Sequence, residues 1–308
     1  MCYSAMVLQH LKSLGYRFKA RIQTDLFEEL YQRRSAGEKL KIPRAMDYNF
    51  TTPSELPSVE VANYIHSYLR RLGSELEQEL FAQKTRLAEA ERKFKEKKTK
   101  TAEKEIGIAG RKIEALKNRL EKLRSNSEQP DDSRIYALQY APVIVWENGE
   151  RVIKPMRYLC RPAGFPESFD RDYPGCYNAR RDSLKNFWKN QYGRNHAILV
   201  ISSFFENVKD SQGQNRVVQF KPKGFDQMII PCVWDRWSEK GQPDLYSFAL
   251  ITDDPPKEVR DAGHDRCPIF IKESNIDSWL RPETVSEATL EKILADREKP
   301  FYEHAMVA

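Results

Sequence analysis

Residues 69–125 form the segment that most constrains the fold of this chain. The segment contains no proline, and Leu, Ala, Glu, Lys and Arg, all good helix formers, dominate it. Two arrays run through it at alternating intervals of three and four: Leu76, Leu80, Gln83, Leu87, Ala90 and Phe94, then Ile106, Ala109, Ile113, Leu116, Leu120 and Leu123. This heptad spacing is typical of packed helices. Because the phase slips between the arrays, we expect an antiparallel helical hairpin that turns near residues 97–101. One continuous helix that dimerises is the competing interpretation.

Most of the positive charge lies in the same segment. The 308 residues carry a net charge of +6, whereas residues 69–125 alone hold 17 Lys and Arg against 10 Asp and Glu. The segment therefore carries +7 and the remainder −1. Net charge is thus weak evidence for a core that binds a polyanion. A basic hairpin either presents a solvated surface or docks nucleic acid or an acidic protein partner.

The chain after the hairpin alternates between short strand-like and helical patterns. Two strand-like runs, 136–146 and 151–159, flank Asn148-Gly149, a strong hairpin-turn signal. Further strand-like runs follow at 197–205, 217–221, 228–234, 246–252 and 268–271. Regular βαβ repeats, GxGxxG and GxxxxGK are absent from the sequence, so neither a Rossmann fold nor a P-loop NTPase is supported. We expect an α+β fold with a mixed or antiparallel sheet. Its expected parts are residues 1–66, an inserted coiled-coil hairpin at 67–128, and the main core at 129–308.

Other sequence signals bear on the compartment. No run of about 18 uninterrupted apolar residues predicts a membrane span, and the N-terminus lacks the pattern of a secretory signal. The five cysteines (2, 160, 176, 232 and 267) are scattered and form no CxxC pair. We therefore expect a cytoplasmic protein with no disulfide framework, metal site or cofactor.

Cys2 is the first candidate for chemistry. Removal of the initiator Met leaves a free α-amine next to the thiol. Such a 1,2-aminothiol condenses with an aldehyde to an imine, and the thiol then closes a thiazolidine ring. Reference pKa values of about 8 for the amine and about 8.5 for the thiol make both groups reactive near neutral pH. Alone, Cys2 is more simply an ordinary residue.

Three further polar residues lie beside apolar strands. Glu206 ends an apolar run, where burial would suit a carboxyl group to proton transfer, although a strand-end Glu often faces solvent. His264 lies in a polar turn before a strand, where a hydrogen bond to its neighbour Asp265 is the simpler interpretation. Asn178 precedes a helical pattern and is a common turn residue type.

Six stretches, in this order, resemble the SOS-response-associated peptidase (SRAP) family, the abasic-site DNA–protein crosslinking proteins. They are Met1-Cys2, Asn178–Arg180, Phe204–Glu206, Cys232–Trp237, Ser247–Thr252 and Gly263–Pro268. Tyr48–Pro53 is similar to a further Tyr-Asn-x-x-Pro loop of the family. The clearest resemblance runs from about 136 to 282 and implies a barrel-like core with peripheral helices.

The resemblance implies a covalent mechanism. The processed Cys2 would attack the ring-opened aldehyde of an abasic site in single-stranded DNA and form a stable thiazolidine. Asn178 would orient its amine. Glu206 would act as general acid and base, also in release of Met1 if that step is autocatalytic, and His264 would assist opening of the deoxyribose. The chain would then have peptidase and lyase-type activity and, in a bacterium, associate with the nucleoid.

The resemblance also implies DNA contacts. Arg180 and Arg266 would hold phosphates, because planar guanidinium groups suit them. Thr252 would form a hydrogen bond near the sugar, and Asn49 would contribute from the Tyr48–Pro53 loop.

The chain departs from the family pattern at several positions. Tyr3 and Ser4 replace a Gly-Arg pair whose Arg contacts DNA, and Asn207 replaces a Trp. A Trp-rich segment is replaced by residues 161–173, in which aromatic residues either stack on bases or pack in the core: Phe165, Phe169 and Tyr173. The hairpin at 69–125 is absent from the common pattern.

Two other functions remain open from the sequence. The same site would serve a cysteine amidohydrolase or autopeptidase, in which Cys2 attacks an amide and Glu206 or His264 relays protons. Alternatively, the chain is a non-catalytic interaction protein that acts through the basic coiled coil.

Overall fold

The computed structural model describes residues 4–52, 56, 58–125, 127–209 and 212–307. Cys2 and Tyr3 therefore lie outside the described residues. The chain divides into two compact units, of which the first comprises residues 1–30, 40–57 and 129–308 and the second residues 31–39 and 58–128.

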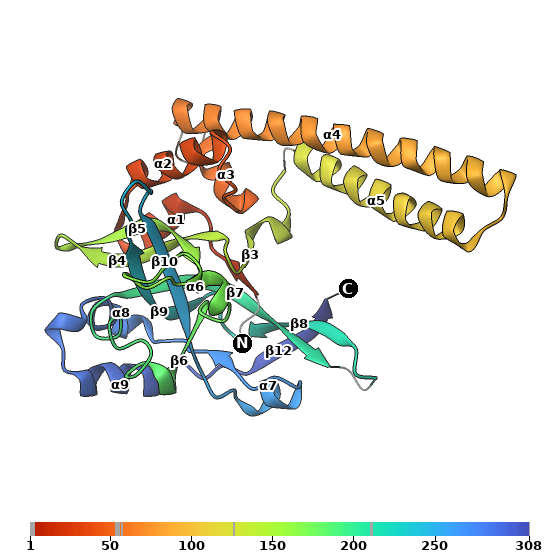
Figure 1. Ribbon diagram of the computed structural model, residues 1–308. Helices are drawn as coiled ribbons and strands as arrows, with labels where there is room; N and C mark the ends of the chain where they lie inside the picture. The colour runs from red at the N-terminus through yellow and green to blue at the C-terminus, as the bar shows by residue number, and fades with distance from the viewer. Residues whose placement is uncertain (1–3, 53–55, 57, 126, 210–211, 308) are drawn as a thin grey trace. The chain divides into compact units, whose positions relative to one another are not determined.

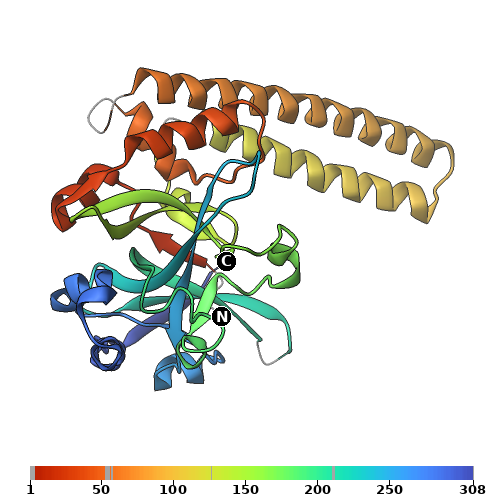
Figure 2. The same cartoon turned by 60° about the vertical axis from the view of Figure 1, so that its left-hand side comes forward.

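A closed ring of five strands forms the centre of the first unit. Figures 1 and 2 show how the strands of this unit lie together. In ring order the strands are β4 (Tyr140–Glu147), β5 (Glu150–Tyr158), β10 (Leu245–Asp253), β9 (Met228–Trp237) and β7 (His196–Lys209), which pairs with β4 again. The β5–β10 pair is parallel and the other four pairs are antiparallel. The predicted α+β fold with a mixed, barrel-like sheet is confirmed.

The turn between β4 and β5 shows how local sequence shapes this ring. Glu147 pairs with Glu150, which leaves Asn148 and Gly149 as a two-residue loop. Their φ angles are +54° and +85°, as a type I′ turn requires. Asn and Gly tolerate this left-handed region better than other residues, so the turn matches the sequence prediction.

Further strands pair with the strands of the ring or with one another. They are β1 (Ser4–Val7) and β3 (Arg134–Tyr136) beyond β7, β8 (Asn215–Pro222) and β12 (Tyr302–Val307) also beyond β7, β6 (Asn178–Arg180) and β11 (Cys267–Pro268) beside β10, and β2 (Ala20–Ile22) beside β5. This topology lays the first described residues against β7 and brings segments from distant parts of the chain to β10.

Short helices surround the strands of this unit. They are α1 (Leu11–Phe18), α3 (Arg44–Thr51), α6 (Phe169–Asp172), α7 (Lys257–Asp261), α8 (Ile276–Leu280) and α9 (Glu287–Ala295), while α2 (Thr24–Ser35) contributes residues to both units. The 3₁₀ turns are η1 (Pro130–Ser133), η2 (Arg181–Ser183), η3 (Glu273–Asn275) and η4 (Pro282–Thr284). Trp279 of α8 is fully buried and donates a 2.9 Å hydrogen bond to the Ala197 carbonyl oxygen, which attaches the helix to β7.

The second unit contains the predicted helical hairpin. Helix α4 (Val59–Glu96) and helix α5 (Lys100–Arg124) run back along each other and meet at the predicted turn. Side chains of Ser58 and Thr99 cap the two N-termini. The two heptad arrays pack against each other within one chain, with a core that includes Leu76, Leu116 and Leu120. Since α4 begins at Val59, the helix starts before the boundary expected at residue 67. No described helix is long and apolar enough to cross a membrane.

Candidate active site

Glu206 and His264 form a buried acid–imidazole pair. Nε2 of His264 lies 3.0 Å from Oε2 of Glu206, and their side chains are 10% and 1% exposed. On the other side of the ring, Nδ1 of His264 lies 3.0 Å from the carbonyl oxygen of Arg266. Nδ1 also accepts a 3.3 Å hydrogen bond from the Arg266 N–H, and in that tautomer Nε2–H donates to Oε2 of Glu206. A proton held between a carboxylate and an imidazole is the arrangement that general acid–base catalysis needs.

The loop between α7 and β11 positions the imidazole. The backbone N–H of His264 donates to the carbonyl of Val259 in the middle of α7. Gly263, just before it, has φ of +96°, a conformation that favours glycine, and a Cβ added there would meet Val208 of β7 at 3.7 Å. The loop therefore lies next to the strand that carries Glu206.

Asn178 and Thr252 lie on one face of the β6–β10 pair. Asn178 is opposite Leu250 and Arg180 is opposite Thr252 in a parallel register, so alternation puts all four side chains on the same face. Asn178 is 8% exposed and Thr252 is fully buried. Among the described residues, the Thr252 hydroxyl has no hydrogen-bond partner.

A bulge in β7 turns Glu206 toward this same face. Leu250, Cys232 and Ala197 pair with one another across β10, β9 and β7, so their side chains share a face. Strict alternation along β7 would point Glu206 to the opposite face. However, the pairing of β7 with β1 skips Ser202, and an extra residue of this kind reverses the alternation beyond it. Glu206 therefore shares the face of Leu250.

The described chain begins beside Glu206. Ser4 is fully buried on β1 and pairs with Phe205 of β7. Because Cys2 lies outside the described residues, its role stays a prediction.

Arg134 is a cation at this site that sequence reasoning missed. Its Nε donates a 2.9 Å hydrogen bond to Oγ of Ser4, and its guanidinium carbon lies 3.6 Å from the centre of the Phe205 ring. In the described part of the chain, Arg134 has no carboxylate partner. Only the pairing of β3 with β1, which places Arg134 opposite Met6, brings it here, and no local motif signals that pairing.

The four described cysteines are poor nucleophiles. Burial raises the pKa of Cys160 and Cys232 well above the usual range, that of Cys176 to about 11 and that of Cys267 to about 12. A thiol with such a pKa is protonated at neutral pH, whereas attack needs the thiolate. No group of three or more His, Cys, Asp and Glu side chains that the structure describes is placed to hold a metal ion.

The predicted DNA contacts differ in their surroundings. Arg180 is half exposed and pairs with Asp182 at 2.6 Å, whereas the Arg266 side chain is 12% exposed and lies 3.6 Å from Asp265. Both guanidinium groups keep further N–H donors for a phosphate.

Asn49 is a correction to the sequence-based assignment. It lies on α3 rather than in a loop and is fully buried. Its Oδ1 accepts a 2.7 Å hydrogen bond from Leu11 N–H, and its Nδ2 donates a 2.8 Å bond to the Gln9 carbonyl. Because the amide holds the chain before α1 against α3, Asn49 has a structural role and is not a DNA contact.

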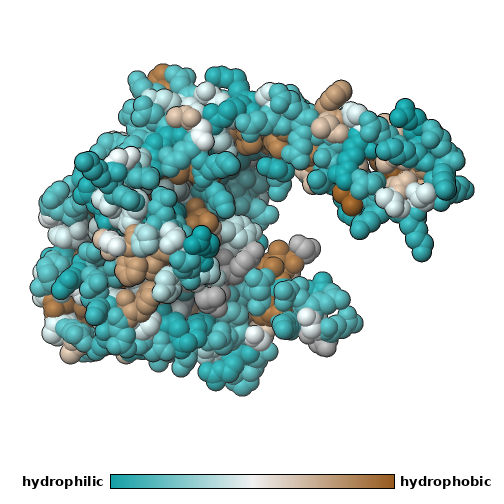
Figure 3. Space-filling view, in the orientation of Figure 1, coloured by the Kyte–Doolittle hydropathy of each residue, from teal (hydrophilic) through white to brown (hydrophobic). Residues whose placement is uncertain are grey.

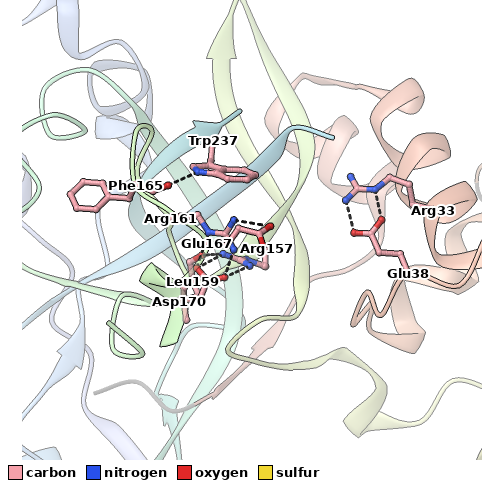
Figure 4. Close-up of polar contacts among 9 residues, drawn as sticks. All are labelled: Arg33, Glu38, Arg157, Leu159, Arg161, Phe165, Glu167, Asp170 and Trp237. Atoms are coloured by element: carbon pink, nitrogen blue, oxygen red, sulfur yellow. Dashed lines mark hydrogen bonds and ion pairs between the residues drawn. The ribbon is translucent and has the colours of Figure 1, made fainter. Parts of the chain in front are cut away.

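A network of arginines fixes the segment at 161–173 (Figure 4). Asp170 accepts hydrogen bonds of 2.7 and 3.0 Å from Arg157 and of 2.5 and 3.1 Å from Arg161. Burial acts to raise the pKa of Asp170, but the bonds from Arg161 and Arg157 outweigh it and hold this pKa below the usual value. In addition, Trp237 Nε1 donates a 2.6 Å bond to the Phe165 carbonyl.

This segment presents a cluster of half-exposed aromatic rings. Phe169 is buried at the centre, with ring centroids of Phe165 at 4.9 Å, Tyr173 at 4.7 Å and Phe187 at 6.5 Å. The three outer residues expose 44%, 48% and 46% of their surface. Phe169 is therefore a core residue, while Phe165 and Tyr173 remain open to a ligand. Phe187 joins them from outside residues 161–173.

A protein-family model matches most of the chain. The model described as SOS response associated peptidase (SRAP) matches residues 89–308. The chain belongs to the SRAP family. The matched range contains Asn178, Glu206 and His264, whereas the Tyr48–Pro53 stretch lies outside it.

Several curated proteins are similar to this SRAP chain. It is 24% identical over 119 residues to the abasic site processing protein YobE of Bacillus subtilis (strain 168), a match that covers 38% of this chain and 54% of YobE. YoqW of Bacillus phage SPbeta is 24% identical over 119 residues (38% and 53%), and YoaM of Bacillus subtilis is 25% identical over 120 residues (38% and 52%); both carry the same description. The match thus spans about half the length of these relatives.

Solved structures also align with the SRAP chain. A protein from Bacteroides thetaiotaomicron is 18% identical, with 57% of this chain and 77% of the other covered at a TM-score of 0.49. A protein from Bordetella bronchiseptica is 16% identical, with 59% and 90% covered at a TM-score of 0.48.

Proposed function

We propose that this SRAP protein traps abasic sites in single-stranded DNA as a covalent thiazolidine at Cys2, after Met1 has been removed. Membership of the family and the abasic-site processing described for its relatives support DNA with such lesions as the substrate. The observation that carries the proposal is the 3.0 Å contact between Glu206 and His264, next to the pair that Phe205 forms with Ser4, the first described residue.

The proposed reaction joins one aldehyde and one aminothiol and releases one water. The amine of Cys2 adds to the C1′ aldehyde of the opened deoxyribose, and Glu206 moves one proton from the nitrogen to the former aldehyde oxygen, which gives the carbinolamine. Glu206 then moves the second nitrogen proton to the carbinolamine hydroxyl, which leaves as water and yields the imine. The thiol gives its proton to Glu206 as its sulfur adds to the imine carbon, and Glu206 passes that proton to the nitrogen as the ring closes. His264 exchanges protons with Glu206 and with the sugar ring oxygen during opening.

The short stretch of chain between Ser4 and Cys2 limits how far Cys2 can lie from Glu206, and this supports the proposed chemistry. Ser4 pairs with Phe205, the residue before Glu206. Two residues of chain span at most about 7 Å, so Cys2 is limited to the neighbourhood of Ser4. Asn178 is proposed to orient the Cys2 amine from the face that β6 and β10 share with Glu206. Release of Met1 by hydrolysis of its peptide bond, with Glu206 as base, belongs to the same proposal.

DNA binding is proposed to combine phosphate and base contacts. Arg180 and Arg266 would hold phosphates, and the Thr252 hydroxyl would form a hydrogen bond to the lesion sugar. We add Arg134, whose place beside Ser4 supplies a cation where the family's arginine is missing from position 4. Bases of a single strand would stack on the exposed aromatic cluster of Phe165, Tyr173 and Phe187, because stacking tolerates any base.

A direct test measures mass and adduct formation. Intact-mass measurement of the purified protein should show loss of Met1. Incubation with a single-stranded oligonucleotide that carries an abasic site should give a heat-stable adduct, whereas the Cys2→Ala variant gives none. An oligonucleotide with a tetrahydrofuran analogue, which has no aldehyde, serves as the matched control. Retention of Met1, or an equal yield of adduct with Cys2→Ala, would refute the proposal.

The same assay separates the other candidate functions. The Glu206–His264 pair would equally relay protons in an amidohydrolase, so hydrolysis of an amide without any DNA adduct would favour that function. Absence of both activities, together with binding that disappears when the hairpin is deleted, would favour a non-catalytic interaction protein.

A further inference from the structure

The end of the hairpin carries a dense group of exposed cations. Residues 92–104, here called the hairpin tip, include the end of α4, the turn and the start of α5. The tip holds seven exposed basic residues against two acidic ones, Glu96 and Glu103: Arg92, Lys93, Lys95, Lys97, Lys98, Lys100 and Lys104. Hydrophilic residues predominate on the face of the hairpin shown in Figure 3.

Ion pairing on the hairpin stops short of the tip. Away from it, cations meet acids along and between the helices, as in Arg86–Glu105 at 2.5 Å and Arg124–Glu77 at 2.5 Å. All of residues 92–104 are described, and none of the tip cations forms an ion pair with a described residue. Their charge is therefore not neutralised by this unit.

Helix stability does not explain the distribution of the tip cations. Lys93 and Lys95 lie in the last turn of α4, where the helix dipole favours positive charge. Lys98 and Lys100 lie at the N-terminus of α5, where the same dipole disfavours it. Since Thr99 already caps the N–H of Ala102 at this helix end, the affinity of the tip for an anion rests on its basic side chains.

We propose that the hairpin tip binds the phosphate backbone of DNA and gives this protein an affinity for the strand that does not depend on the lesion. The choice of DNA as the polyanion rests on the proposed function. Lysines on flexible stems act as point charges and suit contacts that do not read sequence. Phe94 is the aromatic residue of the tip and is partly buried, so base stacking has little part in this contact. Because the chain outside residues 69–125 carries −1, the hairpin supplies the positive charge that DNA binding needs.

Salt dependence of DNA binding tests the inference. The full chain, a tip variant (Lys97→Gln, Lys98→Gln, Lys100→Gln) and a matched control (Lys112→Gln, Arg119→Gln, Lys122→Gln) are titrated with undamaged single-stranded DNA at several NaCl concentrations. The control residues are also exposed on α5 but lie away from the tip. Each lost phosphate contact lowers the slope of log K against log salt by about 0.7, so the tip variant should lose about 2. We expect its Kd at low salt to rise at least tenfold, while that of the control changes by less than threefold. Circular dichroism checks that both variants keep their helices.

The outcomes distinguish this inference from the proposed function. Equal slopes for the tip and control variants would overturn the inference. So would a tip variant that binds DNA like the wild type but no longer binds polyglutamate, since the surface would then fit an acidic protein. At saturating abasic DNA the tip variant should crosslink at the wild-type rate. If the wild type forms no adduct, the proposed function fails, yet the salt slopes still decide whether the tip binds DNA.

Discussion

His196, at the start of β7, is expected to make the fold sensitive to acid. Its ring is 2% exposed and stacks on Trp279 with centroids 3.9 Å apart. Nε2 accepts a 2.9 Å hydrogen bond from the Gly193 N–H, and Nδ1 lies 2.9 Å from the Trp279 carbonyl oxygen. These partners fit the neutral ring with its proton on Nδ1. A second proton on Nε2 would break the bond to Gly193. Burial lowers the pKa of His196 to about 3, although the bond to the Trp279 backbone acts to raise it.

The pKa shift sets the size and direction of the effect. An unfolded histidine titrates near about 6.5, so between that pH and about 3 the unfolded chain binds one more proton than the folded chain. Stability is therefore fully present above about pH 6.5 and falls as the pH drops below it. The slope is about 1.4 kcal/mol per pH unit, so His196 alone should remove about 2.5 kcal/mol between pH 7 and pH 4.5.

Urea unfolding of the wild type and a His196→Gln variant at several pH values between 7 and 4.5 checks this expectation. The variant should be less stable at pH 7, because the stacked ring is lost, but its free energy of unfolding should fall by about 2.5 kcal/mol less than that of the wild type over this range. The other four histidines are common to both proteins and cancel in the difference. Parallel curves for the two proteins would refute the reasoning, because they would show that His196 gains no proton on unfolding.

Further expectations concern the candidate site and the segment at 161–173. Glu206→Gln should slow single-turnover crosslinking by about 10²-fold or more, because general acid–base catalysis contributes that much, and His264→Ala should impair it with an unchanged circular dichroism spectrum. Arg134→Gln should weaken binding of tetrahydrofuran-containing single-stranded DNA and lower the salt slope by about 0.7, measured by fluorescence anisotropy, whereas Arg134→Lys should retain the slope. Asp170→Asn should lower the free energy of urea unfolding by about 3 kcal/mol, since it leaves the largely buried Arg157 without its carboxylate and Arg161 with only its 3.8 Å contact to Glu167; an unchanged midpoint would contradict that role.

Local patterns were sufficient where the structure depends on near neighbours. The heptad arrays predicted the hairpin because the two helices are consecutive and bury their apolar residues against each other. Asn148-Gly149 predicted a turn because few residue types tolerate its backbone angles. Glu206 and His264 were found separately, each beside an apolar strand, but the sequence contained no measure of the 3.0 Å between them.

Non-local strand pairing determines the features that sequence reasoning missed. Arg134 reaches Ser4 across 130 positions through the register of β3 and β1, and no spacing rule predicts that register. The bulge at Ser202, which turns Glu206 to the face of Leu250, is also a property of the β7–β1 pair. Asn49 was misassigned for a related reason. A short motif suggested a loop, whereas its role is set by hydrogen bonds to a segment about 40 positions earlier.

The proposed covalent trap would place unusual demands on affinity, and the charge distribution of the chain fits them. Once a thiazolidine forms, the lifetime of the complex no longer depends on non-covalent contacts, so these contacts need only bring the lesion to Cys2 and hold it during the reaction. Barrel contacts such as Arg134 and the aromatic cluster suit the second task, because they are fixed by neighbouring side chains. The first task depends on the rate at which the protein and the DNA meet. Exposed positive charge raises this association rate, and salt lowers it.

On this reasoning, raising the salt concentration should reduce crosslinking at low DNA concentration far more than at saturation. The hairpin-tip variant should already show at low salt the behaviour that the wild type shows at high salt. A salt effect of equal size at both DNA concentrations would show instead that ions act on the chemistry at the barrel.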